Sequence, residues 1–142
     1  MSFINSLKEK QVLVFGAGVT GASVKRFLDS RGASTFLIDE NASVKETTNF
    51  ESVKLEEIQL GIVSPGWKLD HPFISQSKAA GIELISEIDL AWRVKSELNP
   101  AQVWLGLTGT NGKTTTVQMA EAILLQSGIR ALAWLIGRRD IS

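Results

Sequence analysis

The sequence contains no cysteine. The chain can therefore form no disulfide, no thiolate zinc site and no thiol nucleophile. A reducing compartment is the simplest setting for such a chain, so we expect a cytoplasmic protein.

The chain also lacks an excess of charge of either sign, because 15 lysine and arginine residues balance 15 aspartate and glutamate residues. That balance argues against a protein that binds nucleic acid or acidic membranes. No stretch approaches the roughly 20 consecutive apolar residues that span a bilayer. The amino terminus shows neither the apolar run nor the cleavage site of a signal peptide. We therefore expect a soluble protein with no nucleic-acid and no membrane partner.

What the chain does contain is enough apolar sequence, 44% of its residues, to build a core. The apolar run 12–15 predicts a strand buried on both faces of a parallel sheet. Val24, Phe27 and Leu28 follow at helical spacing, and residues 35–38 predict a second strand, which completes a β-α-β unit. Further strands are predicted at 60–63 and 82–85, and helices from Pro72 to Gly81 and over 87–98.

Asn99 and Pro100 break the last of these helices and mark a predicted domain boundary. We expect a domain over 1–99 and an incomplete one over 100–142, in keeping with the length of the chain. In the second domain the pattern predicts a strand at 103–107, a helix at 115–126 and a strand at 129–136. Met119, Ile123 and Leu124 could face inward there, and Trp92 and Trp104 are interpreted as core residues.

The first glycine-rich loop, G-A-G-V-T-G, lies between a predicted strand and a predicted helix. In this context Gly16 permits a tight turn, Gly18 lets backbone approach a phosphate, and Gly21 allows helix and strand to touch. The following helix would present unpaired N–H groups and a partial positive charge to an anion. Asp39 ends the next strand, where an acid commonly binds ribose hydroxyls.

These residues alone predict a bound nucleotide or dinucleotide, and NAD is the first expectation. The alternative is that the glycines only make a tight turn between strand and helix. For Asp39 by itself, a solvated loop acid is as good an interpretation as a ribose ligand.

The second loop, T-G-T-N-G-K-T-T, also lies between a predicted strand and a predicted helix. Its backbone N–H groups can surround phosphate oxygens, Lys113 can neutralise the β and γ phosphates, and Thr114 can supply a hydroxyl to Mg²⁺. The loop is a variant, because the common pattern has glycine where this chain has Leu107. The competing interpretation is an exposed turn with a surface lysine.

Two phosphate-binding loops in this order, with T-G-T-N-G-K-T-T as the second, resemble the Mur ligases of peptidoglycan synthesis. Three further stretches are similar to the family member that adds D-glutamate. They are G-A-G-V-T-G-A-S followed by Asp39, V-S-P-G with His71 and Pro72 downstream, and A-G-I-E-L-I-S-E-I-D-L-A-W. The resemblance covers residues 11–133, which correspond to about a third of a family member.

The resemblance implies an α/β fold: a Rossmann-like parallel-sheet domain followed by the first β-α-β portion of a P-loop ATPase domain. It also implies that the first domain binds the uridine nucleotide of the substrate, which replaces the NAD expectation. The implied UDP-binding residues are Gly18, Val19, Thr20, Asp39, Glu40, Ser64, Pro65 and Gly66. Family members often carry arginine where this chain has Asn41.

The second loop would bind ATP and Mg²⁺ in a Mur ligase. The implied residues are Gly109, Thr110, Asn111, Gly112, Lys113, Thr114 and Thr115, with Lys113 on the phosphates and Thr114 on the metal in catalytic roles.

The implied reaction is an ATP-dependent amide ligation that adds D-glutamate to UDP-N-acetylmuramoyl-L-alanine through an acyl phosphate. Positioned cations and backbone dipoles would stabilise the charge that develops. The tail from Trp134 to Ser142 departs from the family pattern, and we expect the chain alone to be inactive. Self-association through the unfinished sheet is a further expectation. The alternative to the ligase is a non-catalytic module that senses NAD or another nucleotide.

Other polar and aromatic residues have simpler interpretations. His71 is expected to cap a helix or lie at the surface. Trp67 could cover a base or fill a hydrophobic gap. The acidic neighbours Glu83, Glu87 and Asp89 fit a solvated helix start better than paired acid-base catalysis.

Overall fold

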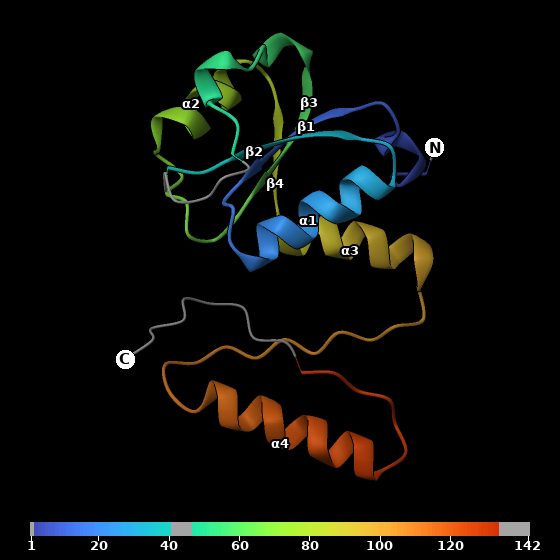
Figure 1. Cartoon of the computed structure of the whole chain (residues 1–142). Helices are drawn as coiled ribbons and strands as arrows, with labels where there is room; N and C mark the ends of the chain where they lie inside the picture. The colour runs from blue at the N-terminus through green and yellow to red at the C-terminus, as the bar shows by residue number, and fades with distance from the viewer. Residues whose placement is uncertain (1, 41–46, 134–142) are drawn as a thin grey trace. The chain divides into compact units, whose positions relative to one another are not determined.

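The computed structural model describes residues 2–40 and 47–133 of the chain (Figure 1). The chain divides into two units, Met1–Ala101 and Gln102–Ser142. This division falls close to the predicted boundary at Asn99 and Pro100.

The first unit is built on a parallel four-stranded sheet. Its strands are β1 (Gln11–Phe15), β2 (Ser34–Ile38), β3 (Ile58–Val63) and β4 (Glu83–Ser86), in the order β2-β1-β3-β4. Every neighbouring pair is parallel. β1 lies between two partners and is buried almost throughout, as its continuous apolar run predicts. The α/β fold expected for this unit is confirmed.

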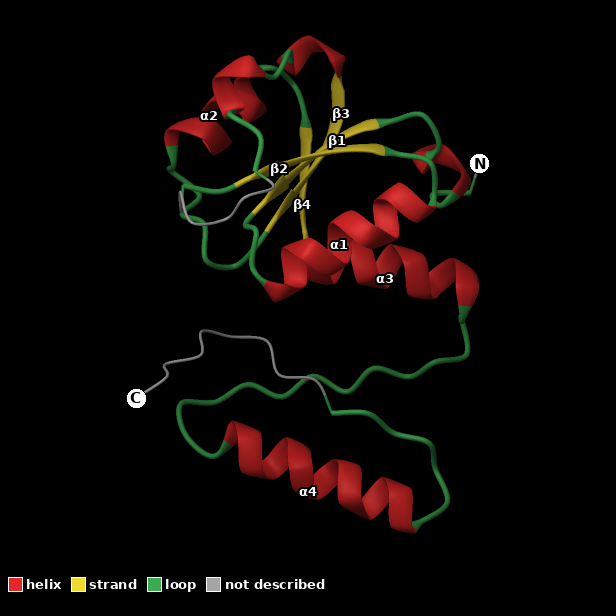
Figure 2. Cartoon of the chain, viewed as in Figure 1, coloured by secondary structure: helices red, strands yellow, loops and turns green. Residues whose placement is uncertain are grey.

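Three helices cover the two faces of the sheet (Figures 1 and 2). They are α1 (Val19–Ser30), α2 (Pro72–Ala79) and α3 (Glu87–Leu98). Alternate residues of β1 point to opposite faces. Val12 and Val14 belong to one core cluster with side chains of α1 and α3. Leu13 and Phe15 belong to a second cluster with Ile74 of α2.

The chain between β2 and β3, where the sequence predicts no helix or strand, contains two short 3₁₀ turns, Phe50–Ser52 and Leu55–Glu57. Phe50 is buried, and its ring stacks on Phe73 with centroids 4.2 Å apart. This turn therefore contributes to the core on the α2 face. Asn41 lies outside the described residues.

The second unit contains one helix, α4 (Lys113–Gln126), within its described residues. The prediction of a strand at 103–107 is wrong. No helix or strand forms there, and Leu105 is 79% exposed. Residues 129–133 form no strand either, and 134–136 lie outside the described residues. A buried strand needs hydrogen-bonded neighbours and a covering layer. The described part of this unit supplies neither.

The packing predictions for four large apolar side chains are also wrong. Met119 and Ile123 on α4 are 59% and 61% exposed. Trp104 is exposed, and Trp92 lies on the surface of α3 with the Lys95 ammonium 4.9 Å from its ring centroid. Lysine stems and ammonium groups commonly cover an exposed indole in this way. Trp134 lies outside the described residues.

No helix within the described ranges combines the length and apolar character that crossing a bilayer requires.

Candidate functional site

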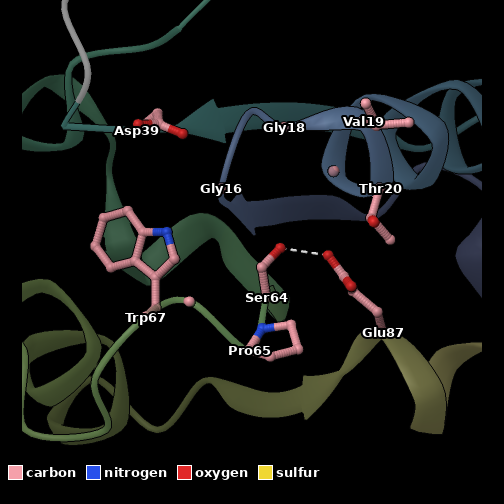
Figure 3. A pocket seen from close by; sticks show the side chains of 11 residues that line it. Gly16, Gly18, Val19, Thr20, Asp39, Ser64, Pro65, Trp67 and Glu87 are labelled. Atoms are coloured by element: carbon pink, nitrogen blue, oxygen red, sulfur yellow. Dashed lines mark hydrogen bonds between the residues drawn. The ribbon is translucent and has the colours of Figure 1, made fainter. Parts of the chain in front are cut away.

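A pocket of about 310 Å³ lies at the carboxyl ends of the strands in the first unit (Figure 3). From the central strand β1, one crossover leads outward to β2, and the next part of the chain returns on the other side to β3. Such a reversal opens a crevice between the loops that follow the two strands, and ligands of open α/β sheets bind there. The lining residues are Gly16, Gly18, Val19, Thr20, Gly21, Asp39, Ser64, Pro65, Gly66, Trp67 and Glu87.

The first glycine loop forms the turn from β1 into α1. Gly16 has φ +107°, a conformation that side chains disfavour. A Cβ on Gly21 would lie 1.7 Å from the carbonyl oxygen of Gly16, so helix and turn touch here. The predicted turn and contact roles of these glycines are confirmed. Gly18 is the residue before α1, and a Cβ added to it would meet nothing within 4 Å. Its predicted approach to a phosphate stays a prediction.

The amino terminus of α1 has no side-chain cap. Its first-turn N–H groups and the positive end of the helix dipole are suited to an anion. Val19, at the first helical position, is 87% exposed and lies at this end of the pocket.

Asp39 braces the glycine loop from the end of β2. Its Oδ2 accepts a hydrogen bond of 2.6 Å from the backbone N–H of Ala17. Within the pocket Asp39 therefore holds the loop in place, a role that the sequence did not indicate.

Ser64 and Glu87 form the opposite wall (Figure 3). Ser64 follows β3, and its backbone N–H donates to the carbonyl of Phe15 at 3.1 Å. Its hydroxyl donates to the carboxylate of Glu87 at the start of α3. Glu87 was interpreted only as part of a solvated helix start, so sequence reasoning missed it as a pocket residue. Its place directly after a strand was the available signal, because residues at the ends of parallel strands share one edge of the sheet.

The other acids near Glu87 do not join this pocket. Glu83 and Asp89 pair with Arg93 at 2.8 and 3.0 Å. Hydrogen bonds from the guanidinium to these two carboxylates, Glu83 first, raise the pKa of Arg93. Glu83 and Asp89 are therefore held by Arg93, whereas Glu87 bonds to Ser64 in the pocket wall.

The aromatic side of the pocket is set by Trp67. Its ring lies edge-on to Phe15 at 5.2 Å and to His71 at 4.6 Å, and it packs with the α2-face core while also lining the pocket. His71 caps α2, as predicted: its Nδ1 accepts from the backbone N–H of Phe73 at 3.2 Å. Its Nε2 lies 2.9 Å from a carboxylate oxygen of Glu40.

The structure brings together all but one of the residues expected to bind UDP. Glu40 is the exception, since it is exposed, contacts His71 and does not line the pocket. Contact with a nucleotide stays a prediction for the others, which are Gly18, Val19, Thr20, Asp39, Ser64, Pro65 and Gly66.

In the second glycine loop, the side chain of Lys113 bonds to backbone carbonyls of the loop itself. Gly109 and Gly112 have φ +157° and +74°. The Lys113 ammonium donates to the carbonyl of Gly109 and, at 3.3 Å, to that of Thr110. Thr114 and Thr115 are exposed in the first turn of α4. A loop with these glycines, this lysine and a following helix has the groups needed to hold phosphates. Among the described residues, no cluster of three potential metal ligands is present.

A parallel sheet with a glycine loop and a pocket at its switch point gives the first unit a Rossmann-like α/β architecture. Residues 10–86 match the family model described as Mur ligase MurD-like, N-terminal domain. The chain belongs to this family, which confirms the resemblance found in the sequence.

Curated relatives support the same assignment. UDP-N-acetylmuramoylalanine–D-glutamate ligase of Thermobifida fusca is 40% identical over 142 residues, covering 89% of this chain and 30% of the relative. The ligases of the same name from Nocardia farcinica and Corynebacterium diphtheriae are 36% and 32% identical. The matches cover 89% and 87% of this chain, and 29% of each relative. The chain thus spans about 30% of the length of the curated relatives it matches.

Proposed function

We propose that this chain is the amino-terminal part of an ATP-dependent ligase that adds D-glutamate to UDP-N-acetylmuramoyl-L-alanine. The first unit binds the UDP part of that substrate in the pocket between Gly16 and Glu87. The observation that carries the proposal is the position of this pocket at the switch point of a domain whose curated relatives are ligases of this name.

The geometry suits a diphosphate. The uncapped start of α1 attracts anions, and Gly18 leaves open space beside it. Asp39 holds the loop through Ala17, so the backbone N–H groups are preorganised before a ligand arrives. Trp67 offers an apolar ring surface at the edge of the pocket.

The second glycine loop is the proposed ATP site. Lys113 would exchange its bonds with the loop carbonyls for bonds with phosphate oxygens, and Thr114 would hold Mg²⁺. In the complete ligase, ATP with Mg²⁺ would supply the γ-phosphoryl group that converts the L-alanyl carboxylate to an acyl phosphate with release of ADP. The D-glutamate amine would then form the amide bond by displacing phosphate. We propose that the chain alone binds but does not turn over substrate.

The direct test is calorimetric titration of the chain with UDP-N-acetylmuramoyl-L-alanine, with NAD⁺ and Mg-ATP titrated in parallel. The proposal expects saturable binding of the UDP ligand and none of NAD⁺. Binding of NAD⁺ alone would instead identify the nucleotide-sensing module and remove the ligase assignment.

The ATP site needs its own variant, Lys113→Ala. This substitution removes the ammonium group that bonds to the loop carbonyls of Gly109 and Thr110. Mg-ATP binding should therefore weaken about tenfold or more. Binding of the UDP ligand should not change. Equal Mg-ATP binding by the variant would argue against a phosphate-binding role for this loop.

A further inference from the structure

Two carboxylates line the pocket at the amino-terminal end of α1. Asp39 follows β2 at one edge of the sheet, and Glu87 follows β4 at the other edge. The glycine loop follows β1 between them, and Figure 3 shows the two acids on opposite sides of the pocket. Three strand spacings separate the edges, roughly 14 Å. This distance fits a ligand with a central diphosphate and a different group at each end.

The two acids differ in their contacts. Asp39 accepts a hydrogen bond from the backbone N–H of Ala17 and so stabilises the glycine loop. Glu87 accepts the hydroxyl of Ser64, whose Cβ and Oγ lie against Gly16. Glu87 is therefore fixed at the pocket wall by a side chain that itself touches the loop. It is half-buried.

An ionised carboxylate accepts hydrogen bonds and donates none. It repels a terminal phosphate, whereas it can accept a bond from a hydroxyl or an amide N–H of a neutral group. A carboxylate in the pocket wall can therefore discriminate between ligands in two ways: it attracts a neutral hydrogen-bond donor and repels a terminal phosphate.

We infer that Glu87 is a specificity-determining residue that favours a nucleoside diphosphate carrying a sugar over a free nucleoside diphosphate. It accepts a hydrogen bond from the sugar end of the ligand and opposes the extra charge of a terminal phosphate. The inference rests on the proposed function, since it assigns a subsite of the same pocket.

The test compares calorimetric binding of UDP and of UDP-N-acetylmuramoyl-L-alanine to the chain and to Glu87→Gln. Glutamine retains the size of the side chain and can still accept from Ser64, but it carries no charge. The control is Glu56→Gln, which makes the same change in net charge at an exposed residue outside the pocket. Circular dichroism verifies that each variant is folded.

The selectivity ratio, the Kd for UDP divided by the Kd for the sugar nucleotide, should fall about tenfold in Glu87→Gln. It should stay unchanged in Glu56→Gln. A second variant, Glu87→Asp, keeps the charge but shortens the reach, so UDP should bind as weakly as to the unsubstituted chain while the sugar nucleotide loses affinity. If Glu87→Gln does not fold, Glu87→Asp still tests the role of Glu87 in ligand selectivity.

A ratio within twofold of the unsubstituted chain in Glu87→Gln would overturn the inference, as would tighter UDP binding by Glu87→Asp. In that case the proposed function stands if the unsubstituted chain binds the sugar nucleotide. If the unsubstituted chain binds neither uridine ligand, both the proposed function and this inference fail.

Discussion

At the scale of single residues, the three glycines of the first loop have separable roles. Gly16 makes the turn at positive φ, Gly21 makes the contact between helix and turn, and Gly18 does neither. A motif of this kind is often treated as one unit. The structure assigns the first and third glycines to folding, and contact of the second with a ligand stays a prediction.

This division predicts opposite outcomes for two alanine substitutions. Gly21→Ala places a Cβ 1.7 Å from a backbone oxygen, so the helix must shift, and the free energy of unfolding should fall by about 1–3 kcal/mol or more. Gly18→Ala has open space and an ordinary φ of −66°, so its stability should change little while affinity for the UDP ligand falls. Urea titration and calorimetry measure the two effects. Equal destabilisation by both substitutions would contradict the division of roles.

The sequence predicted the residues of the glycine loop because their roles depend on local backbone geometry. It did not predict Glu87 or the bond from Asp39 to Ala17. Both depend on which strand ends become neighbours, and that requires the order β2-β1-β3-β4. Glu40, in contrast, was expected to bind UDP and does not line the pocket. It follows Asp39 in the chain, but its carboxylate contacts His71 instead.

At the scale of elements, α3 anchors the amino-terminal segment of the chain. Glu97 accepts hydrogen bonds from the Ser2 hydroxyl and from the backbone N–H groups of Phe3 and, at 3.1 Å, Ile4. The bond from Ser2 is the main reason that the pKa of Glu97 lies below its ordinary value of 4.5, and the two backbone bonds lower it further. The segment is thus tied to the last turn of the helix by one carboxylate.

The lowered pKa fixes the sign of a pH effect. A carboxyl group whose folded pKa is depressed stabilises the fold above its unfolded pKa, and this stabilisation is lost as the pH falls through the folded value. The amide resonances of Phe3 and Ile4 should therefore titrate with a midpoint below 4.5. Glu97→Gln should abolish that transition, and Glu56→Gln should preserve it. A midpoint at or above the ordinary value, read from amide chemical shifts against pH, would contradict the anchoring.

The strands of the first unit were predictable because each apolar run finds partners within the unit. The run at 103–107 has the same pattern and forms no strand. Apolar periodicity reports what a segment could bury, whereas a strand also needs neighbours for its N–H and C=O groups. The helix predicted at 115–126 is confirmed as α4, because helical hydrogen bonds lie within the segment itself.

At the scale of the whole molecule, the two units differ in how much apolar surface they cover. The first has two buried clusters, whereas α4 contains no buried residue. Several large apolar side chains of the second unit are more than half exposed: Val103, Leu105, Met119, Ile123, Leu125, Ile129 and Leu132. Exposed apolar side chains in this number favour association.

We therefore keep the expectation of self-association but assign it to these side chains rather than to a sheet edge. The double substitution Leu105→Lys and Leu132→Lys, at residues 79% and 81% exposed, should shift the chain toward monomer in sedimentation velocity. Leu69→Lys, at a residue 73% exposed in the first unit, is the matched control and should leave association unchanged. A strictly monomeric chain at high concentration would contradict this expectation.

The crevice at the carboxyl ends of β1 and β3 is the proposed binding site for a uridine diphosphate ligand. The most direct test is to map amide chemical shifts while UDP-N-acetylmuramoyl-L-alanine is added to the labelled chain. The saturating shifts should concentrate on residues 16–21 and 64–67, and the amide of Glu87 should shift over the same range of ligand concentration. Saturating shifts that leave these loops unchanged, or no shifts at all, would contradict the proposed binding site.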